Sequence, residues 1–293
     1  MKYIKFKNSK KITLKKFLLD KSISMRAYKE LLKKGILVND NPVFKNINLN
    51  NEDIVKLAID EEGLDYEPIK GYLDVVYEDE NILVVNKPSN LTVNSKNQVS
   101  LSNYIANYFL ENDIKAKIRL INRLDMNTSG LCMVAKNKFA QAYYQKQIEE
   151  GVIVKKYLAY VEGNLRIDEL FKTKLTYDEV NKSYKTGEKG KTAITYFKTI
   201  DVNERYSLIE CNIKTGKTHQ IRASLKSLDH PILGDTLYGS NINLERFLLH
   251  SYYLEFVEFI NQERIIIKNI PDFKPFLTNL WKDLSCNFFE NIL

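Results

Sequence analysis

A single carboxylate in the segment INRLDMNTSGLCMVAK, residues 121–136, is the first candidate for chemistry. An apolar stretch leads into Arg123 and Asp125, a polar turn follows, and a second apolar stretch comes next. Aspartate is common at such a break because its side chain caps turns, and Thr128 and Ser129 favour a turn here. The alternative is that the turn presents the carboxylate for catalysis. Taken alone, this segment favours a turn-capping role for Asp125.

Other charged or aromatic side chains stand where the sequence predicts that strands end, and these could act together with the carboxylate: Lys87, Arg123, Tyr157, Lys217, His219 and Arg222. Each has an ordinary alternative. Tyr157 is one of 18 tyrosines, Arg222 fits the surface of a helix, and Lys217 and His219 fit a turn. None of these residues is a specific signal by itself.

Several mechanisms have no support in the sequence. There is no G-x-G-x-x-G segment, no Walker A loop and no G-x-S-x-G elbow, so nucleotide cofactors and serine hydrolysis are not indicated. The three cysteines are far apart and form no C-x-x-C pair, and the three histidines lack the spacing of metal ligands. We therefore expect no cofactor, no metal and a reducing cytoplasm.

The elements that would position these residues come after residue 73. Runs with β-type alternation or β-branched content are frequent there: DVVYEDENILVVNKP, VIVKKYLAYVEG, KTAITYFKTI, RYSLIECNIK, FLLHSYYLEF and RIIIKNI. Three segments have helical spacing instead: LSNYIANYFLEN, KFAQAYYQKQIEEG and HQIRASLKSLD. Because helices interrupt the strands irregularly, residues 73–293 predict an α+β domain with a mixed, largely antiparallel sheet and flanking helices.

The first 58 residues predict a separate, small α/β unit. Thr13 and Ser24 are placed to cap two short helices, and Gly35 suits the position after the second. Two short apolar runs then flank a turn at residues 39–42, and DIVKLA closes the unit as a strand. Residues 59–72 are acidic and lack periodicity, which indicates a linker.

Three basic residues of the second helix, Arg26, Lys29 and Lys33, share one face at i, i+3 and i+7. Charge alone leaves two interpretations open, a solvated face or a phosphate-binding surface. The whole chain has 44 Lys and Arg against 37 Asp and Glu, a net charge of +7, which suits a polyanionic partner. No continuous apolar stretch is as long as the core of a signal peptide or as a membrane span, so no membrane association is expected.

Three segments in order, NRLDMNTSGLCMVAK, KKYLAYVEG and IKTGKTHQIRASLKSLDHPILGDTLYG, resemble the signature segments of the RluA-type RNA pseudouridine synthases. NILVVNKPSNLTV and LLHSYYLEF resemble two weaker ones. The likeness spans about residues 73–274. Residues 12–57 resemble an S4 domain, a small RNA-binding module that is common in this class, and this favours the phosphate-binding interpretation of its helix.

The sequence departs from the family pattern in three segments. Asn122 stands where His usually precedes Arg-Leu-Asp, and Lys217 stands where the turn before the histidine usually has Arg. Ser89 and Asn94 replace a Gly and a His after Lys-Pro. These departures concern RNA contacts more than the catalytic aspartate.

The resemblance implies that uridine is flipped out of its stack and isomerised to pseudouridine without a cofactor. Asp125 would be the catalytic carboxylate, Tyr157 would stack on the uracil, and Arg222 would hold the carboxylate. Arg123, Lys87, Lys217 and His219 would contact substrate RNA. The expected substrate is large-subunit ribosomal RNA, with no protein partner implied; the alternatives are a tRNA-directed synthase and a non-catalytic RNA-binding factor of ribosome assembly.

Overall fold

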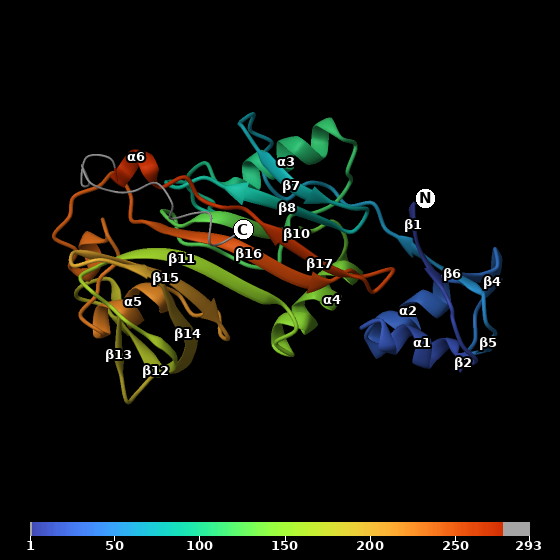
Figure 1. Cartoon of the computed structure of the whole chain (residues 1–293). Helices are drawn as coiled ribbons and strands as arrows, with labels where there is room; N and C mark the ends of the chain where they lie inside the picture. Colours follow the sequence, from blue (N-terminus) through green and yellow to red (C-terminus); the bar gives the residue numbers. More distant parts are fainter. Residues whose placement is uncertain (1, 278–293) are drawn as a thin grey trace.

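The computed structural model of the chain describes residues 2–277, so the last part of the expected catalytic domain, residues 278–293, lies outside the described residues. Figure 1 shows a small N-terminal unit of strands and helices beside a larger part built around one long, twisted sheet. The α+β class with a large, mostly antiparallel sheet is confirmed.

The N-terminal unit has two helices over a four-stranded sheet of order β1-β6-β3-β4. Both expected helix caps are present, because Thr13 Oγ1 accepts from Lys16 N and Ser24 Oγ accepts from Ala27 N. The elements are β1 (Lys2–Lys7), β2 (Ile12–Thr13), α1 (Leu14–Asp20), α2 (Met25–Lys34), β3 (Ile36–Val38), β4 (Asn41–Val43), β5 (Asn48–Leu49) and β6 (Ile54–Ile59).

The larger sheet has eleven strands in the order β13-β12-β14-β15-β11-β16-β10-β8-β7, with β17 paired to β16 and β9 paired to β10. One pair of these strands, β10 and β16, is parallel, and the other pairs are antiparallel. The strands are β7 (Asp74–Glu78), β8 (Ile82–Lys87), β9 (Arg119–Leu120), β10 (Ser129–Ala135), β11 (Val154–Glu162), β12 (Asp168–Asp178), β13 (Ser183–Gly187), β14 (Lys191–Val202), β15 (Tyr206–Ile213), β16 (Leu249–Val257) and β17 (Arg264–Lys268).

Helices cover both faces of this sheet. Alternate residues of β8 pack into two cores, Leu83 and Val85 with α3 on one face, and Ile82 and Val84 with α4 on the other. Figure 1 shows α3 and α4 on opposite sides of these strands, with α5 beside the strands at the other end of the sheet. The helices are α3 (Leu101–Glu111), α4 (Lys138–Glu149), α5 (Gln220–Ser227), η1 (Thr236–Tyr238) and α6 (Lys274–Leu277).

The N-terminal unit packs directly against the larger part. The ring of Phe6 lies 5.2 Å from that of Phe259, edge to face, and Phe259 lies 4.8 Å from Tyr143 of α4. Asp60, which follows β6, accepts from Lys34 at 2.8 Å and from Lys138 at 2.9 Å. The two parts therefore share one apolar core that is closed at its edge by a shared carboxylate.

The acidic segment after β6 runs along the larger part. Glu62 pairs with Arg119, Glu61 pairs with Lys115 at 3.3 Å, and Asp65 Oδ1 accepts from the backbone N–H of Ile118 at 2.8 Å. Its negative charges thus stabilise the approach to β9. No helix within residues 2–277 is long and apolar enough to cross a membrane.

Candidate active site

Asp125 lies in the turn between β9 and β10, at the edge of a cavity. The turn is closed by its backbone, since the N–H of Thr128 donates to the Asp125 carbonyl at 3.1 Å. The carboxylate itself is left free of the turn, and its side chain is 25% exposed. The backbone carbonyl of Asp125 therefore closes the turn, and its carboxylate remains available to the cavity.

Asn122, the unusual residue just before, has a structural explanation. Its Oδ1 accepts from the backbone N–H of Met133 at 2.8 Å, and its Nδ2 donates to the carbonyl of Leu131 at 3.2 Å. The amide side chain therefore extends the pairing of β9 with β10 beyond the last backbone bridge. This anchors the segment from which Asp125 projects.

Arg222 comes from the first turn of α5 and contacts Asp125, which lines the same cavity. Its Nη1 donates to Asp125 Oδ2 at 3.2 Å. The rings of Tyr238 and Phe247 lie 4.9 Å and 4.4 Å from its guanidinium carbon. Burial alone would lower the pKa of Arg222, but the bonds and charges of Asp235 and Asp125 raise it, so the guanidinium stays charged.

Asp235 is a residue of this site that the sequence did not single out. It is almost fully buried, and its two oxygens accept from Arg222 Nε at 2.7 Å and Nη2 at 2.9 Å. Such a two-bond pair fixes the plane of a guanidinium, which leaves Nη1 directed at Asp125. The only hint in the sequence was its place in HPILGDTLYG, a segment that carried the family resemblance.

Tyr157 of β11 lines the same cavity and is 5% exposed. Burial is the main cause that raises the pKa of its phenol, a hydrogen bond from Ser251 opposes this, and the charge of Asp125 adds to it. The phenol is therefore protonated at neutral pH. This favours a stacking ring over a proton acceptor.

His219 begins α5 in the left-handed region, at φ 55°. Its Nδ1 lies 3.0 Å from the Tyr238 hydroxyl, and its Nε2 lies 3.9 Å from Asp125 Oδ2. Burial, opposed by the charge of Asp125, lowers the pKa of His219 and favours the neutral ring. His219 is thus beside the carboxylate rather than at the outer rim.

The cavity has a volume of about 810 Å³, and residues of α4 and α5 are among those that line it. Asp125, Tyr157, Arg222 and His219 line it together, and the exposed side chains of Arg123 and Lys217 stand at its rim. No group of three or more His, Cys, Asp or Glu side chains within residues 2–277 is placed to hold a metal ion.

Lys87 was expected to contact RNA, and the structure contradicts this. The side chain at the end of β8 is fully buried. Its ammonium donates to the carbonyls of Pro88 at 2.7 Å, Leu91 at 2.7 Å and Met126 at 3.0 Å. Burial lowers the pKa of Lys87 to about 7. Lys87 therefore ties the loop after β8 to the turn that carries Asp125, and it has no surface to offer RNA.

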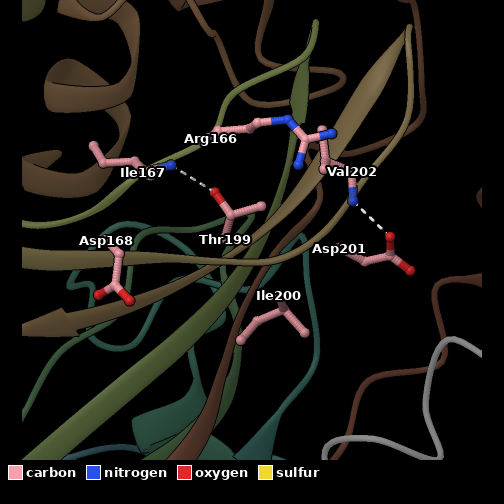
Figure 2. A pocket seen from close by; sticks show the side chains of 7 residues that line it. All are labelled: Arg166, Ile167, Asp168, Thr199, Ile200, Asp201 and Val202. Carbon is pink, nitrogen blue, oxygen red and sulfur yellow. Dashed lines mark hydrogen bonds between the residues drawn. The ribbon is translucent and has the colours of Figure 1, made fainter.

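A second hollow, of about 470 Å³, lies away from these residues (Figure 2). It is lined by Arg166, Ile167, Asp168, Thr199, Ile200, Asp201 and Val202. Two of its polar side chains bond to nearby backbone, since Ile167 N donates to Thr199 Oγ1 at 2.9 Å and Val202 N donates to Asp201 Oδ1 at 2.6 Å. None of the expected site residues lines it, so the chemistry belongs to the first cavity.

The first cavity brings the Asp125 carboxylate together with the guanidinium of Arg222 and the buried ring of Tyr157. Residues 81–227 match the model of the RNA pseudouridylate synthase family. An uncharacterized RNA pseudouridine synthase of Bacillus subtilis, YhcT, is 35% identical over 79% of this chain and 80% of its own length. The ribosomal large subunit pseudouridine synthase D of Neisseria meningitidis serogroup A is 33% identical over 71% of this chain and 58% of its own length.

A solved structure has the same fold. The human RNA pseudouridylate synthase domain containing 1 aligns with a TM-score of 0.62 at 23% identity, over 77% of this chain and 96% of that one. The chain therefore belongs to the RNA pseudouridylate synthase family and is an isomerase that acts on RNA.

Proposed function

We propose that the chain converts uridines of large-subunit ribosomal RNA to pseudouridine, with Asp125 as the catalytic carboxylate. The observation that carries this proposal is the Asp125 carboxylate, bonded to Arg222 at 3.2 Å in a cavity that Tyr157 also lines. A relative named for the large ribosomal subunit supports the choice of RNA. The cavity is large enough for a flipped nucleotide.

The reaction is an isomerisation. The bond from N1 of uracil to C1′ of ribose breaks, a bond from C5 to C1′ forms, C5 loses a proton and N1 ends with one. The carboxylate attacks C1′, adds to C6 of uracil or removes the 2′ proton, and all three roles require its ionised form. The charged Arg222 favours that form and fixes its direction. Asp235 fixes Arg222 in turn.

Tyr157 is proposed to stack on the flipped uracil, which is worth about 1–3 kcal/mol per base. Flipping costs a few kcal/mol, so further contacts to the RNA backbone must offset it. Arg123 and Lys217 at the rim of the cavity are exposed and are proposed to supply such contacts.

Residues 1–58 are proposed to be an S4-like RNA-binding module, joined by residues 59–72 to a catalytic domain of residues 73–293. Arg26, Lys29 and Lys33 are exposed on α2 and are available to phosphates. The direct packing of this module on the larger part supports a fixed arrangement in which both bind one RNA.

The test is release of tritium from RNA labelled at C5 of uracil, with ribosomal RNA and tRNA transcripts assayed separately. We expect release from large-subunit ribosomal RNA by the wild type, and release at background by Asp125→Asn. Asp113→Asn, at an exposed aspartate, is the control and should act as the wild type does.

Each other outcome changes the proposal. Release from tRNA alone would replace the substrate, and full activity of Asp125→Asn would remove the catalytic role. Tight binding of ribosomal RNA without release from any RNA would point to the assembly-factor alternative.

A further inference from the structure

Lys155 of β11 is a buried cation that the mechanism does not use. It stands two residues before Tyr157, and successive odd positions of a strand lie on one face. The register with β15 is regular across both residues, Lys155 opposite Ile213 and Tyr157 opposite Cys211, so the two side chains share that face. Lys155 lines the same cavity as Asp125 and Tyr157, and only 8% of it is exposed.

The ammonium of Lys155 has no hydrogen-bond or ion-pair partner within residues 2–277. Its neighbour Lys156, on the opposite face of the same strand, does have partners. Lys156 Nζ lies 3.2 Å from Glu210 Oε1 and 5.1 Å from the ring centre of Tyr253. One lysine of this pair is thus neutralised by the protein, and the other is not.

A buried charge without a partner is costly, which is why such groups are usually paired. Burial lowers the pKa of Lys155, and no nearby carboxylate offsets this effect. Two other buried cations near the site have protein partners. Arg222 is bonded to two carboxylates, and Lys87 donates to three carbonyls. Lys155 therefore fits a site in which the ligand brings the missing negative charge.

At neutral pH the anionic groups of RNA are its phosphodiesters. A uridine flipped onto Tyr157 brings its flanking phosphates with it, and Lys155 stands about 6.6 Å further along the strand, at 3.3 Å per residue. We propose that Lys155 binds a phosphate that flanks the flipped uridine. This inference rests on the proposed function of the cavity and adds the contact that holds the flipped nucleotide by its backbone.

A contact between Lys155 and a phosphate should affect the binding of RNA but not the rate of the chemical step. A phosphate is unchanged during the isomerisation, so its contact is equally strong in the ground state and in the transition state. Loss of such a contact weakens binding and leaves the rate of the bound complex unchanged. A contact from Lys155 to a uracil carbonyl would instead change that rate, because charge on the ring changes during the reaction.

The experiment compares Lys155→Gln with the matched control Lys156→Gln, which removes the same charge from the opposite face. Binding of an unmodified large-subunit ribosomal RNA transcript is measured from low to high salt, and tritium release is measured at saturating enzyme in a single turnover. For Lys155→Gln we expect a Kd raised about ten- to hundredfold, as for loss of one charged hydrogen bond. The slope of log K against log salt should fall by about 0.7–0.9, as for one phosphate.

The single-turnover rate of Lys155→Gln should match that of the wild type, and Lys155→Arg should recover most of the binding. Lys156→Gln should leave affinity, slope and rate as they are. An unchanged salt slope with a slower single turnover would overturn the proposal in favour of a uracil contact. Unchanged affinity and slope would overturn it outright. The binding measurements decide the matter even if the wild type releases no tritium, a result that would count against the proposed function alone.

Discussion

Arg222 is shared unequally between two aspartates. Asp235 takes two of its hydrogen bonds, at 2.7 Å and 2.9 Å, and Asp125 takes one at 3.2 Å. The two aromatic rings beside the guanidinium leave it little freedom to turn. The buried Asp235 thus anchors the guanidinium, and Asp125, whose side chain is 25% exposed, holds it by one longer bond.

Replacing Asp235 by Asn should therefore impair both stability and catalysis. The amide keeps the shape but removes the charge, and breaking a buried pair at one partner costs about 3–5 kcal/mol. Arg222 would also lose the partner that directs its Nη1 at Asp125, which should slow tritium release at least tenfold. Denaturant unfolding and single-turnover release measure the two effects.

Asp229→Asn is the control, at an exposed aspartate of the same region. A variant Asp235→Asn with the wild-type rate would show that Arg222 keeps its direction without the anchor.

For individual residues, the sequence predicted the residue types of the site but not their environments. Asp125, Tyr157 and Arg222 do lie around one cavity. The burial of Lys87 could not be foreseen, because it depends on carbonyls of Pro88, Leu91 and Met126 that the fold brings together. Asp235 was missed for the same reason, since an aspartate is recognised as an anchor only when its arginine is known.

Among the elements, the parallel pair of β10 and β16 supports the turn that carries Asp125. Ser129 lies opposite His250, and Gly130 lies opposite Ser251. Arg246 Nη2 donates to Ser129 Oγ at 2.8 Å, and that hydroxyl lies 2.7 Å from His250 Nδ1. His250 Nε2 donates to the carbonyl of Asn269 at 2.9 Å, which leaves Nδ1 to accept. Burial lowers the pKa of His250 to about 4, in keeping with this neutral form.

Gly130→Ala should break this junction. Gly130 has φ 110°, and an added Cβ would lie 2.3 Å from the carbonyl oxygen of Ser251. The strained backbone costs on the order of 1–3 kcal/mol before the clash is counted. We expect a lower free energy of unfolding and a large loss of tritium release, because the strand that leads away from Asp125 must move.

Gly63→Ala is the matched control, since nothing lies within 4 Å of its added Cβ. Equal stability of Gly130→Ala and the wild type in denaturant unfolding would contradict this view of the junction.

The local elements could largely be predicted, and their pairing could not. The caps at Thr13 and Ser24 and the helical spacing of residues 101–111 gave correct helices. Strand β1 was missed, because KYIKFK does not alternate strictly and pairs with β6, residues 54–59, far along the chain. The pairing of β10 with β16 joins residues 121 positions apart, and no local pattern reports such a contact.

For the molecule as a whole, the N-terminal unit presents basic residues on two opposite sides. Ile4 and Phe6 of β1 are buried towards the core, and Phe6 contacts Phe17 of α1 at 6.2 Å. The intervening residues Lys5 and Lys7 therefore project from the other face of the sheet. The proposed RNA-binding face is that of α2, which carries Arg26, Lys29 and Lys33.

A triple variant tests which face binds RNA. Changing Arg26, Lys29 and Lys33 to Gln should weaken binding of a ribosomal RNA transcript and lower its salt slope by up to about 2–3, at 0.7–0.9 for each phosphate contact. The single-turnover rate at saturation should change little, because none of these residues lines the cavity of Asp125. Filter binding over a range of salt measures the slope.

Changing Lys2, Lys5 and Lys7 to Gln removes the same charge from the same unit and should have a much smaller effect. Equal effects of the two triple variants would mean that net charge, rather than the α2 face, attracts the RNA.

The parallel pair also affects the order in which parts of the chain can fold during synthesis. Chains fold from the N-terminus while they are being made, so the N-terminal unit and β10 leave the ribosome long before residues 250–251. Until those residues emerge, β10 lacks its neighbour and the turn of Asp125 lacks its support. In a nascent chain the basic N-terminal helices can therefore form first, and the turn that carries Asp125 gains its supporting strand only after residues 250–251 have left the ribosome.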